Sequence, residues 1–149
     1  MKIIQQDMLA LKEGVLFHQV NCQGVMGGGI AYAFARKWPG LEAAYKRYIK
    51  ETKIGGKTSS MLGKVFIYRP DPSKQLWIAN VFGQNNVSKS SRMTSYDATV
   101  EAFELMGDTN VQAYFPYKMG CGLGGGNWTI YASIIEAYFP DAIICQHNA

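Results

Sequence analysis

Two glycine-rich segments hold the residues of this sequence whose types and spacing could do chemistry. The first runs from Asn21 to Ala31 (NCQGVMGGGIA) and the second from Gly120 to Trp128 (GCGLGGGNW). Each is predicted to leave a buried strand and to open a helix. Glycine lets backbone N–H groups approach a ligand without a Cβ in the way, and a helix N-terminus adds partial positive charge. Two such loops predict an anion site, for two phosphates or for one phosphate and a sugar.

The standard nucleotide-binding motifs do not fit these loops. A GxGxxG fingerprint starting at Gly27 would need glycine at Tyr32, and one starting at Gly122 would need glycine at Asn127. The alternative interpretation is that both loops are tight turns that pack helices onto a sheet.

Few side chains near these loops could serve as a base or nucleophile. His18 stands three residues before Asn21, and a histidine with a pKa near neutrality can act as a general base or nucleophile. Strand alternation puts the two residues on different faces unless a bulge intervenes, so a hydrogen-bonded core histidine is the alternative. Cys22 and Cys121 are expected to be small packing residues, because a thiol nucleophile needs a base or a positive field.

Composition sets the class of protein. The 149 residues, 48% hydrophobic and only 17% charged, suit one domain over 1–149 and exclude wholesale disorder. No apolar run reaches the roughly 18 residues of a membrane span, and the N-terminal segment lacks the apolar core of a signal peptide. Three cysteines without a CxxC pair predict neither a disulfide framework nor a zinc site. We therefore expect a cytoplasmic protein without membrane contact.

Positive charge is concentrated in one stretch of the chain. Between Arg36 and Lys57 stand seven Lys or Arg residues and two Glu residues, in a chain whose net charge is +4. The simple interpretation is a solvated helix face, and the alternative is a landing surface for a polyanion.

Hydrophobic periodicity predicts strands and helices that alternate around the two loops. A polar loop is expected over 82–94, with Thr94 and Asp97 as a capping box for the helix that follows, and Gly107 and Asn127 are expected to be helix caps. The result is an α/β layer sandwich of about six strands and four helices. Strands are expected at 2–5, 15–21, 64–68, 75–81, 111–115 and 142–146, and helices before Pro39, near 41–49, at 95–106 and between Asn127 and Pro140.

The two loops, with Trp38-Pro39 and Tyr45 between them, resemble a macro domain. The closest similarity is to the short, stand-alone branch that includes ADP-ribose 1″-phosphate phosphatases and ADP-ribosyl hydrolases, and it covers nearly the whole chain. The resemblance implies a three-layer α/β/α sandwich with a mixed central sheet of about six strands. It also implies a cleft at the strand ends that binds ADP-ribose without a metal or cofactor.

The resemblance assigns roles to individual residues. Asp7 would accept a hydrogen bond from the adenine amino group, and Asn21 would contact the distal ribose. Phe82 would lie over the distal part of the ligand, with aromatic core packing as the alternative. The implied binding residues also include Gly27, Gly28 and Gly29 at the distal ribose and its 1″ substituent, Gly122, Leu123, Gly124, Gly125 and Gly126 around the pyrophosphate, and Ile30, Gln84 and Asn127.

The chemistry implied by the resemblance depends on three positions. De-ADP-ribosylating members use a lysine where this chain has Gln84, and an acidic residue where it has Gly124 or Asn127. The side chains at these positions cannot ionise, so Lys89 or Lys118 would have to take the place of the family's lysine. A histidine at the spacing of His18 occurs in the yeast-type phosphatase.

These positions lead to three hypotheses for function. The favoured one is hydrolysis of ADP-ribose 1″-phosphate by a monomer, with His18 and Asn21 as the catalytic residues and 82–92 as a lid. The first alternative is a hydrolase of ADP-ribosylated DNA or protein, which the basic stretch favours. The second is a reader that binds ADP-ribose without turnover.

Overall fold

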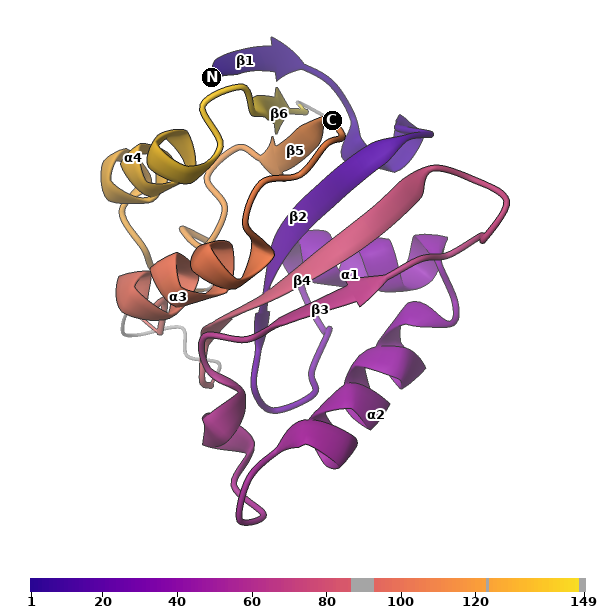
Figure 1. Ribbon diagram of the computed structural model, residues 1–149, viewed down its shortest axis with the longest axis vertical. Helices are drawn as coiled ribbons and strands as arrows, with labels where there is room; N and C mark the ends of the chain where they lie inside the picture. Colours follow the sequence, from indigo (N-terminus) through magenta and orange to yellow (C-terminus); the bar gives the residue numbers. More distant parts are fainter. Residues whose placement is uncertain (87–92, 123, 148–149) are drawn as a thin grey trace.

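The computed structural model describes residues 1–86, 93–122 and 124–147 of the chain (Figure 1). Strands and helices alternate along the sequence, with one single-turn 3-10 helix after the first strand and another after the second long helix. The elements are β1 (Lys2–Gln5), η1 (Met8–Ala10), β2 (Gly14–Asn21), α1 (Gly29–Lys37), α2 (Leu41–Thr52), η2 (Thr58–Met61), β3 (Val65–Tyr68), β4 (Leu76–Gln84), α3 (Tyr96–Met106), β5 (Ala113–Pro116), α4 (Trp128–Tyr138) and β6 (Ile143–Gln146).

The strands form one mixed sheet in the order β1-β6-β5-β2-β4-β3. Strand β3 runs antiparallel to β4, and all other neighbours are parallel. The central strand β2 is buried along its whole length, as expected for a parallel strand covered on both faces. The expected mixed sheet of six strands is confirmed.

Side-chain alternation along β2 divides the core between the two faces of the sheet. Leu16 and Val20 face α1 and α2, where Phe34, Tyr45 and Ile49 complete one apolar cluster. The intervening residues face α3 and α4 and join a second cluster, which contains Val15, Phe17, Phe103, Phe115, Tyr131 and Ile135. Helices therefore cover both faces of the sheet (Figure 1), and the expected three-layer sandwich is confirmed.

The sequence prediction was wrong where β4 ends. This strand continues through Gln84, whereas a loop was expected from Phe82. Phe82 is fully buried within the α1–α2 cluster, and the polar side chain of Gln84 is buried as well. Strand β2 extends beside β4 as far as the pairing of Asn21 with Gln84, so the partner strand explains the extra length.

Helix caps were predicted with mixed success. Ser95, not Thr94, caps α3, because its side chain accepts a hydrogen bond from Ala98 N. Gly107 ends that helix at φ +61°, and Asn127 caps α4 by accepting from Ile130 N, both as expected.

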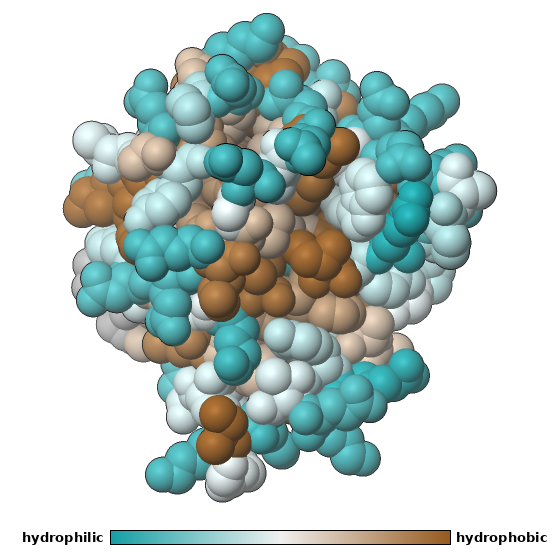
Figure 2. All heavy atoms as spheres, viewed as in Figure 1, coloured by the Kyte–Doolittle hydropathy of each residue, from teal (hydrophilic) through white to brown (hydrophobic). Residues whose placement is uncertain are grey.

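One face of the molecule combines apolar and charged surface. Apolar side chains gather in the middle of the face in Figure 2, around β3, β4 and α3, and hydrophilic side chains frame them. Ile67 on the edge strand β3 is 41% exposed. None of the helices in the described parts of the chain has the length and apolar character of a membrane span.

Candidate functional site

A cleft lies where the chain leaves two neighbouring parallel strands towards opposite faces of the sheet. Strand β2 leads to α1 on one face, and its neighbour β5 leads to α4 on the other. Such a switch point leaves a crevice outside the carboxyl ends of the strands. The cleft has a volume of about 470 Å³, and its lining combines both glycine-rich loops with the ends of β2, β4 and β5: Gln19, Val20, Asn21, Val25, Gly27, Gly28, Gly29, Ile30, Ala31, Gln84, Pro116, Tyr117, Lys118, Met119, Gly120, Gly122 and Gly124.

Asn21 shapes the first glycine-rich loop from within. Its Oδ1 accepts hydrogen bonds from the backbone N–H groups of Gln23 (2.9 Å) and Val25 (3.2 Å), and its Nδ2 donates to Val25 O (2.7 Å). The hydroxyl of Tyr45 donates to the backbone oxygen of Asn21. The register with β4 shifts between Val20 and Asn21, so Gly83 of β4 has no partner in β2 and forms a β-bulge beside Asn21. Asn21 therefore lines the cleft while its amide holds the loop in shape.

The first loop ends at the N-terminus of α1, which faces the cleft. Gly28 is the N-cap residue, and no side chain makes a capping hydrogen bond there. Gly29 has φ +58°, and a Cβ added to it would meet no atom of the part of the chain that the structure describes within 4 Å. The first N–H groups of α1 lack intrahelical partners, so this end of the cleft presents backbone donors.

A buried polar network lies beneath the second glycine-rich loop, and Gln19 is at its centre. Its Nε2 donates to Gln84 Oε1 (2.7 Å) and Thr94 Oγ1 (2.9 Å), while its Oε1 accepts from the hydroxyl of Tyr131 (3.0 Å). Thr94 Oγ1 in turn donates to Gly120 O (2.6 Å). Gln19 thereby connects β4, the start of α3, the second loop and α4. Gln19 was not predicted as a site residue, because a lone Gln inside a buried strand belongs to no motif.

Three glycines of the second loop make room for this network. An added Cβ would lie 2.8 Å from Gln19 Oε1 at Gly120, 2.4 Å from Thr94 Oγ1 at Gly124, and 2.8 Å from the carbonyl oxygen of Gly120 at Gly126. At Gly122, in contrast, an added Cβ would meet no atom of the described residues within 4 Å. Three glycines of the loop are therefore required by internal packing. Gly122 instead borders open space in the cleft.

The structure does not bring His18 to the cleft. The side chain is fully buried on the α1 side of the sheet, 4.7 Å from the ring of Phe34 between centroids. Its Nε2 lies 2.5 Å from Asn80 Oδ1, and Nδ1 has no partner. Asn80 Nδ2 donates to two backbone carbonyls, so its Oδ1 accepts and the Nε2 of His18 carries the proton. Burial lowers the pKa of His18 to about 4. His18 is therefore a hydrogen-bonded core histidine, which was the alternative prediction. A buried neutral imidazole away from the cleft cannot accept a proton from a group in the cleft.

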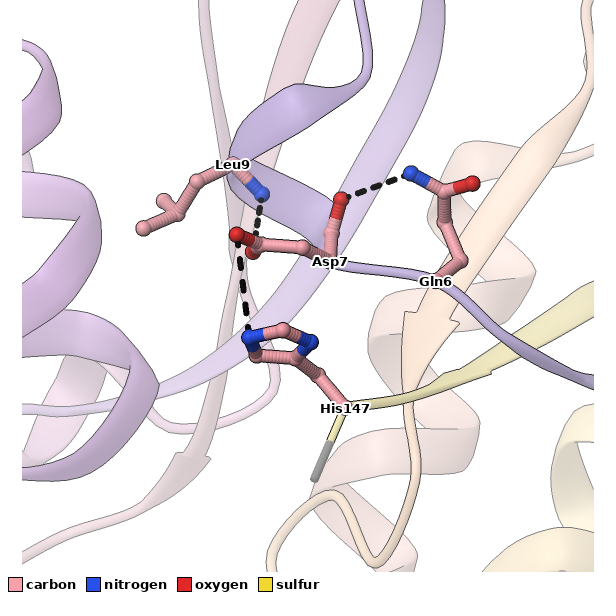
Figure 3. Close-up of polar contacts among 4 residues, drawn as sticks. All are labelled: Gln6, Asp7, Leu9 and His147. Carbon is pink, nitrogen blue, oxygen red and sulfur yellow. Dashed lines mark hydrogen bonds and ion pairs between the residues drawn. The ribbon is translucent and has the colours of Figure 1, made fainter. Parts of the chain in front are cut away.

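Asp7 and His147 meet outside the lining of the cleft, at the adjacent ends of β1 and β6 (Figure 3). Asp7 Oδ1 accepts from the backbone N–H of Leu9 (2.9 Å) and caps η1. The second carboxylate oxygen faces His147 Nε2 at 3.9 Å, and the Asp7 side chain is 39% exposed. Asp7 is therefore a cap that retains an accessible oxygen.

The other predicted residues divide between the cleft and its surroundings. Gly27, Gly28, Gly29, Ile30, Gln84, Gly122 and Gly124 line the cleft with Asn21, whereas Phe82, Gly125, Gly126 and Asn127 do not. The core alternative holds for Phe82, whose ring lies 5.7 Å from Tyr45 and 6.0 Å from Tyr48. Leu123, Lys89 and most of the expected lid fall outside the described residues.

Ionisable groups are scarce in the cleft. Lys118 is the one charged side chain among the described residues that line it. Cys22 is buried in the core as expected, and burial raises its pKa to about 11. Cys121 is half-buried, and burial raises its pKa too. Nowhere in the described ranges do three or more His, Cys, Asp or Glu side chains gather in a way that could hold a metal ion.

The basic stretch borders the first loop. Lys46, Arg47 and Lys50 are exposed on α2. A Cβ added to Gly24 would lie 3.5 Å from Lys46 Cγ, and Thr58 Oγ1 donates to Gln23 Oε1 at 3.3 Å. Positive surface thus adjoins the β2–α1 side of the cleft.

Known proteins resemble this chain in sequence and in fold. The macro domain family model matches residues 17–135. A DNA ADP-ribosyl glycohydrolase of Mycobacterium tuberculosis is 28% identical over 126 residues, which make up 82% of this chain and 34% of that protein. The chain thus spans about a third of the length of this curated relative.

Two solved structures superimpose over nearly the whole chain. A protein of unknown function from Bacteroides thetaiotaomicron has a TM-score of 0.81 and 25% identity, covering 98% of this chain and 96% of that one. Thermosipho africanus DarTG in complex with ADP-ribose has a TM-score of 0.77 and 18% identity, covering 98% of this chain and 41% of that one. The second likeness concerns the fold alone. With the family match over most of its length and a cleft framed by two glycine-rich loops, the chain belongs to the macro domain family.

Proposed function

We propose that this macro domain binds ADP-ribose in the cleft between its two glycine-rich loops. The observation that carries the proposal is the open, glycine-lined space on both walls, beside Gly29 and beside Gly122. A volume of about 470 Å³ falls within the usual range for small-molecule sites, roughly 300–1,000 Å³. Backbone N–H groups there can neutralise a pyrophosphate without a metal. The partly exposed carboxylate of Asp7 would accept a hydrogen bond from the adenine amino group in place of its contact with His147.

The reaction we propose is hydrolysis of ADP-ribose 1″-phosphate to ADP-ribose and phosphate. A water oxygen attacks phosphorus, the bond from phosphorus to the 1″ oxygen breaks, and that oxygen leaves on ADP-ribose with a proton. Backbone donors near Gly28 and Gly29 would stabilise the charge on the transferred phosphoryl group. Gln84 supports this choice over a lysine–carboxylate cleavage of an ADP-ribosyl bond, because it cannot ionise. Its side chain is already engaged with Gln19 and with Asn86 O.

Two measurements test this proposal. Calorimetry with ADP-ribose should detect binding at a single site, and incubation with ADP-ribose 1″-phosphate should release inorganic phosphate. Binding without release would assign the protein as a reader and reject the phosphatase. A Gly28→Glu variant places a charged side chain at the start of α1 and should abolish binding. Full affinity in that variant would place the site elsewhere.

A second candidate function is hydrolysis of ADP-ribose from modified DNA. Two observations favour it, the relative named as a DNA ADP-ribosyl glycohydrolase and the basic surface of α2 beside the first loop. An oligonucleotide carrying ADP-ribose, compared with the free 1″-phosphate, separates the two activities. Release of ADP-ribose from DNA that is lost in a Lys46→Glu/Lys50→Glu variant would favour this candidate, while no release by the wild type would exclude it.

A further inference from the structure

Lys118 occupies a distinctive place on the wall of the cleft. It follows the end of β5 by two residues and comes directly before the second glycine-rich loop. Met119 N donates to Pro116 O (3.0 Å) and Cys121 N donates to Lys118 O (2.9 Å), which folds the segment into two successive turns. The side chain of Met119 is buried in the core and anchors these turns. The exposed Lys118 is thus held on the same wall as the backbone of the second loop.

The backbone of Lys118 is strained. Its φ of +60° lies in the left-handed region, and no other non-glycine residue of the described chain adopts a positive φ. Nine glycines adopt one, and glycine at position 118 would avoid the free-energy cost. Strain of this kind persists where the surrounding structure enforces it, and residues that carry it cluster at active sites and ligand clamps. The lysine side chain is therefore expected to have a use that glycine cannot supply.

The ammonium group of Lys118 is oriented but not neutralised. Its Nζ lies 5.5 Å from the centre of the Tyr117 ring, and that ring packs edge-on against Trp128, with centroids 5.3 Å apart. A cation–π contact holds a cation in place without cancelling its charge. Within the described parts of the chain the one ion pair is that of His147 with Asp7, so no carboxylate pairs with Lys118.

We infer that Lys118 binds the pyrophosphate of a nucleoside diphosphate sugar in the cleft. The inference rests on the proposed function and adds a cationic contact to the backbone donors. Lys118 adjoins the second loop, so the phosphates near that loop are the ones its ammonium reaches. An ammonium is a strong donor to phosphate oxygens, because both partners are charged.

Substitution by glycine tests this inference and separates charge from backbone. Lys118→Gly removes the ammonium and relieves the positive φ, so the melting temperature should be unchanged or higher. The Kd for ADP-ribose should rise about tenfold to a hundredfold, by the same factor for ADP-ribose and ADP-ribose 1″-phosphate. Adenosine, which lacks phosphates, should bind wild type and variant equally. Lys118→Arg should retain most of the affinity, because it keeps the charge.

Lys74→Gly is the matched control. It removes one positive charge in the turn that leads into β4, at the opposite end of the sheet from the cleft, and should change the Kd by less than twofold. If wild type does not bind ADP-ribose, the proposed function falls and the inference with it. If wild type binds and Lys118→Gly binds equally well, the inference alone is overturned. A loss confined to the 1″-phosphorylated ligand would also overturn the assignment to the pyrophosphate.

Discussion

Two glycines of the second loop, Gly122 and Gly124, are predicted to respond in opposite ways to the same substitution. Both line the cleft, but only one is surrounded by protein. At Gly124 a Cβ would lie 2.4 Å from Thr94 Oγ1 and 2.8 Å from Gly120 O, whereas at Gly122 it would meet none of the described atoms within 4 Å. Gly124→Ala should therefore damage the fold, and Gly122→Ala should damage ligand binding.

The size of the Gly124→Ala effect can be worked out from these contacts. Carbon and oxygen atoms in contact lie about 3.5 Å apart, so Thr94 Oγ1 would have to move by about 1 Å. That oxygen is held by hydrogen bonds to Gly120 O (2.6 Å) and Gln19 Nε2 (2.9 Å). Overpacking costs about 1–3 kcal/mol, and one weakened hydrogen bond adds about 1 kcal/mol. At about 2–4 °C per kcal/mol, a loss near 3 kcal/mol lowers the melting temperature by about 6–12 °C.

Gly122→Ala has no such cost. The residue lacks a positive φ, and a surface substitution of this kind changes the free energy of unfolding by about 0.5 kcal/mol at most. Its methyl group would occupy space that we assign to the pyrophosphate, so the Kd for ADP-ribose should rise at least about tenfold. Thermal unfolding and calorimetry on both variants check the pair. A Gly122→Ala protein with full affinity would refute the assignment of the second loop to the ligand, and a Gly124→Ala protein with wild-type stability would refute the packing argument.

Three further predictions concern the supports of the cleft. Burial lowers the pKa of His18 to about 4 from an ordinary value near 6.5. As the pH falls, His18 therefore takes up a proton in the unfolded chain before it does so in the folded chain. Stability should be fully present above pH 6.5 and fall by about 3 kcal/mol towards pH 4. His18→Leu should lose that part of the pH dependence in urea unfolding, and an unchanged pH profile would contradict the burial argument. Gln19→Leu removes the acceptor of the Tyr131 hydroxyl and the donor to Gln84 Oε1, and should destabilise by about 2–4 kcal/mol in urea unfolding. Asn127→Ala removes the cap of α4 and should cost about 1 kcal/mol, while an unaffected melting curve would exclude that role.

The two glycine-rich loops could be predicted because their signal is local. Strand, glycine run and helix follow one another within about ten residues, and the caps Gly107 and Asn127 depend on neighbours in sequence. The alternation of side chains along β2 also determines which of its residues face each of the two helix layers. These features depend on short-range chemistry, so a single sequence contains enough to place them.

The end of β4 could not be predicted because its cause is tertiary. Phe82 and Gln84 continue the strand beside β2, where Gln84 accepts a hydrogen bond from Gln19. Those two residues lie 65 positions apart, so no local pattern indicates the contact. The position of Asn21 also depends on a contact from another element, since the hydroxyl of Tyr45 on α2 donates to its backbone oxygen.

His18 and Lys118 show why residue type alone misleads about chemistry. Histidine has the pKa for acid–base work, but its place on β2 puts it among Phe34 and Asn80, where burial keeps it neutral. Lysine has an ordinary pKa far from neutrality, yet a strained turn holds Lys118 at the mouth of the cleft. The cleft is therefore lined by one positively charged side chain and by backbone N–H donors, whereas the imidazole of His18 is buried in the core. A described lining of this kind suits an anionic ligand, because its backbone donors and its one ammonium group all present positive charge.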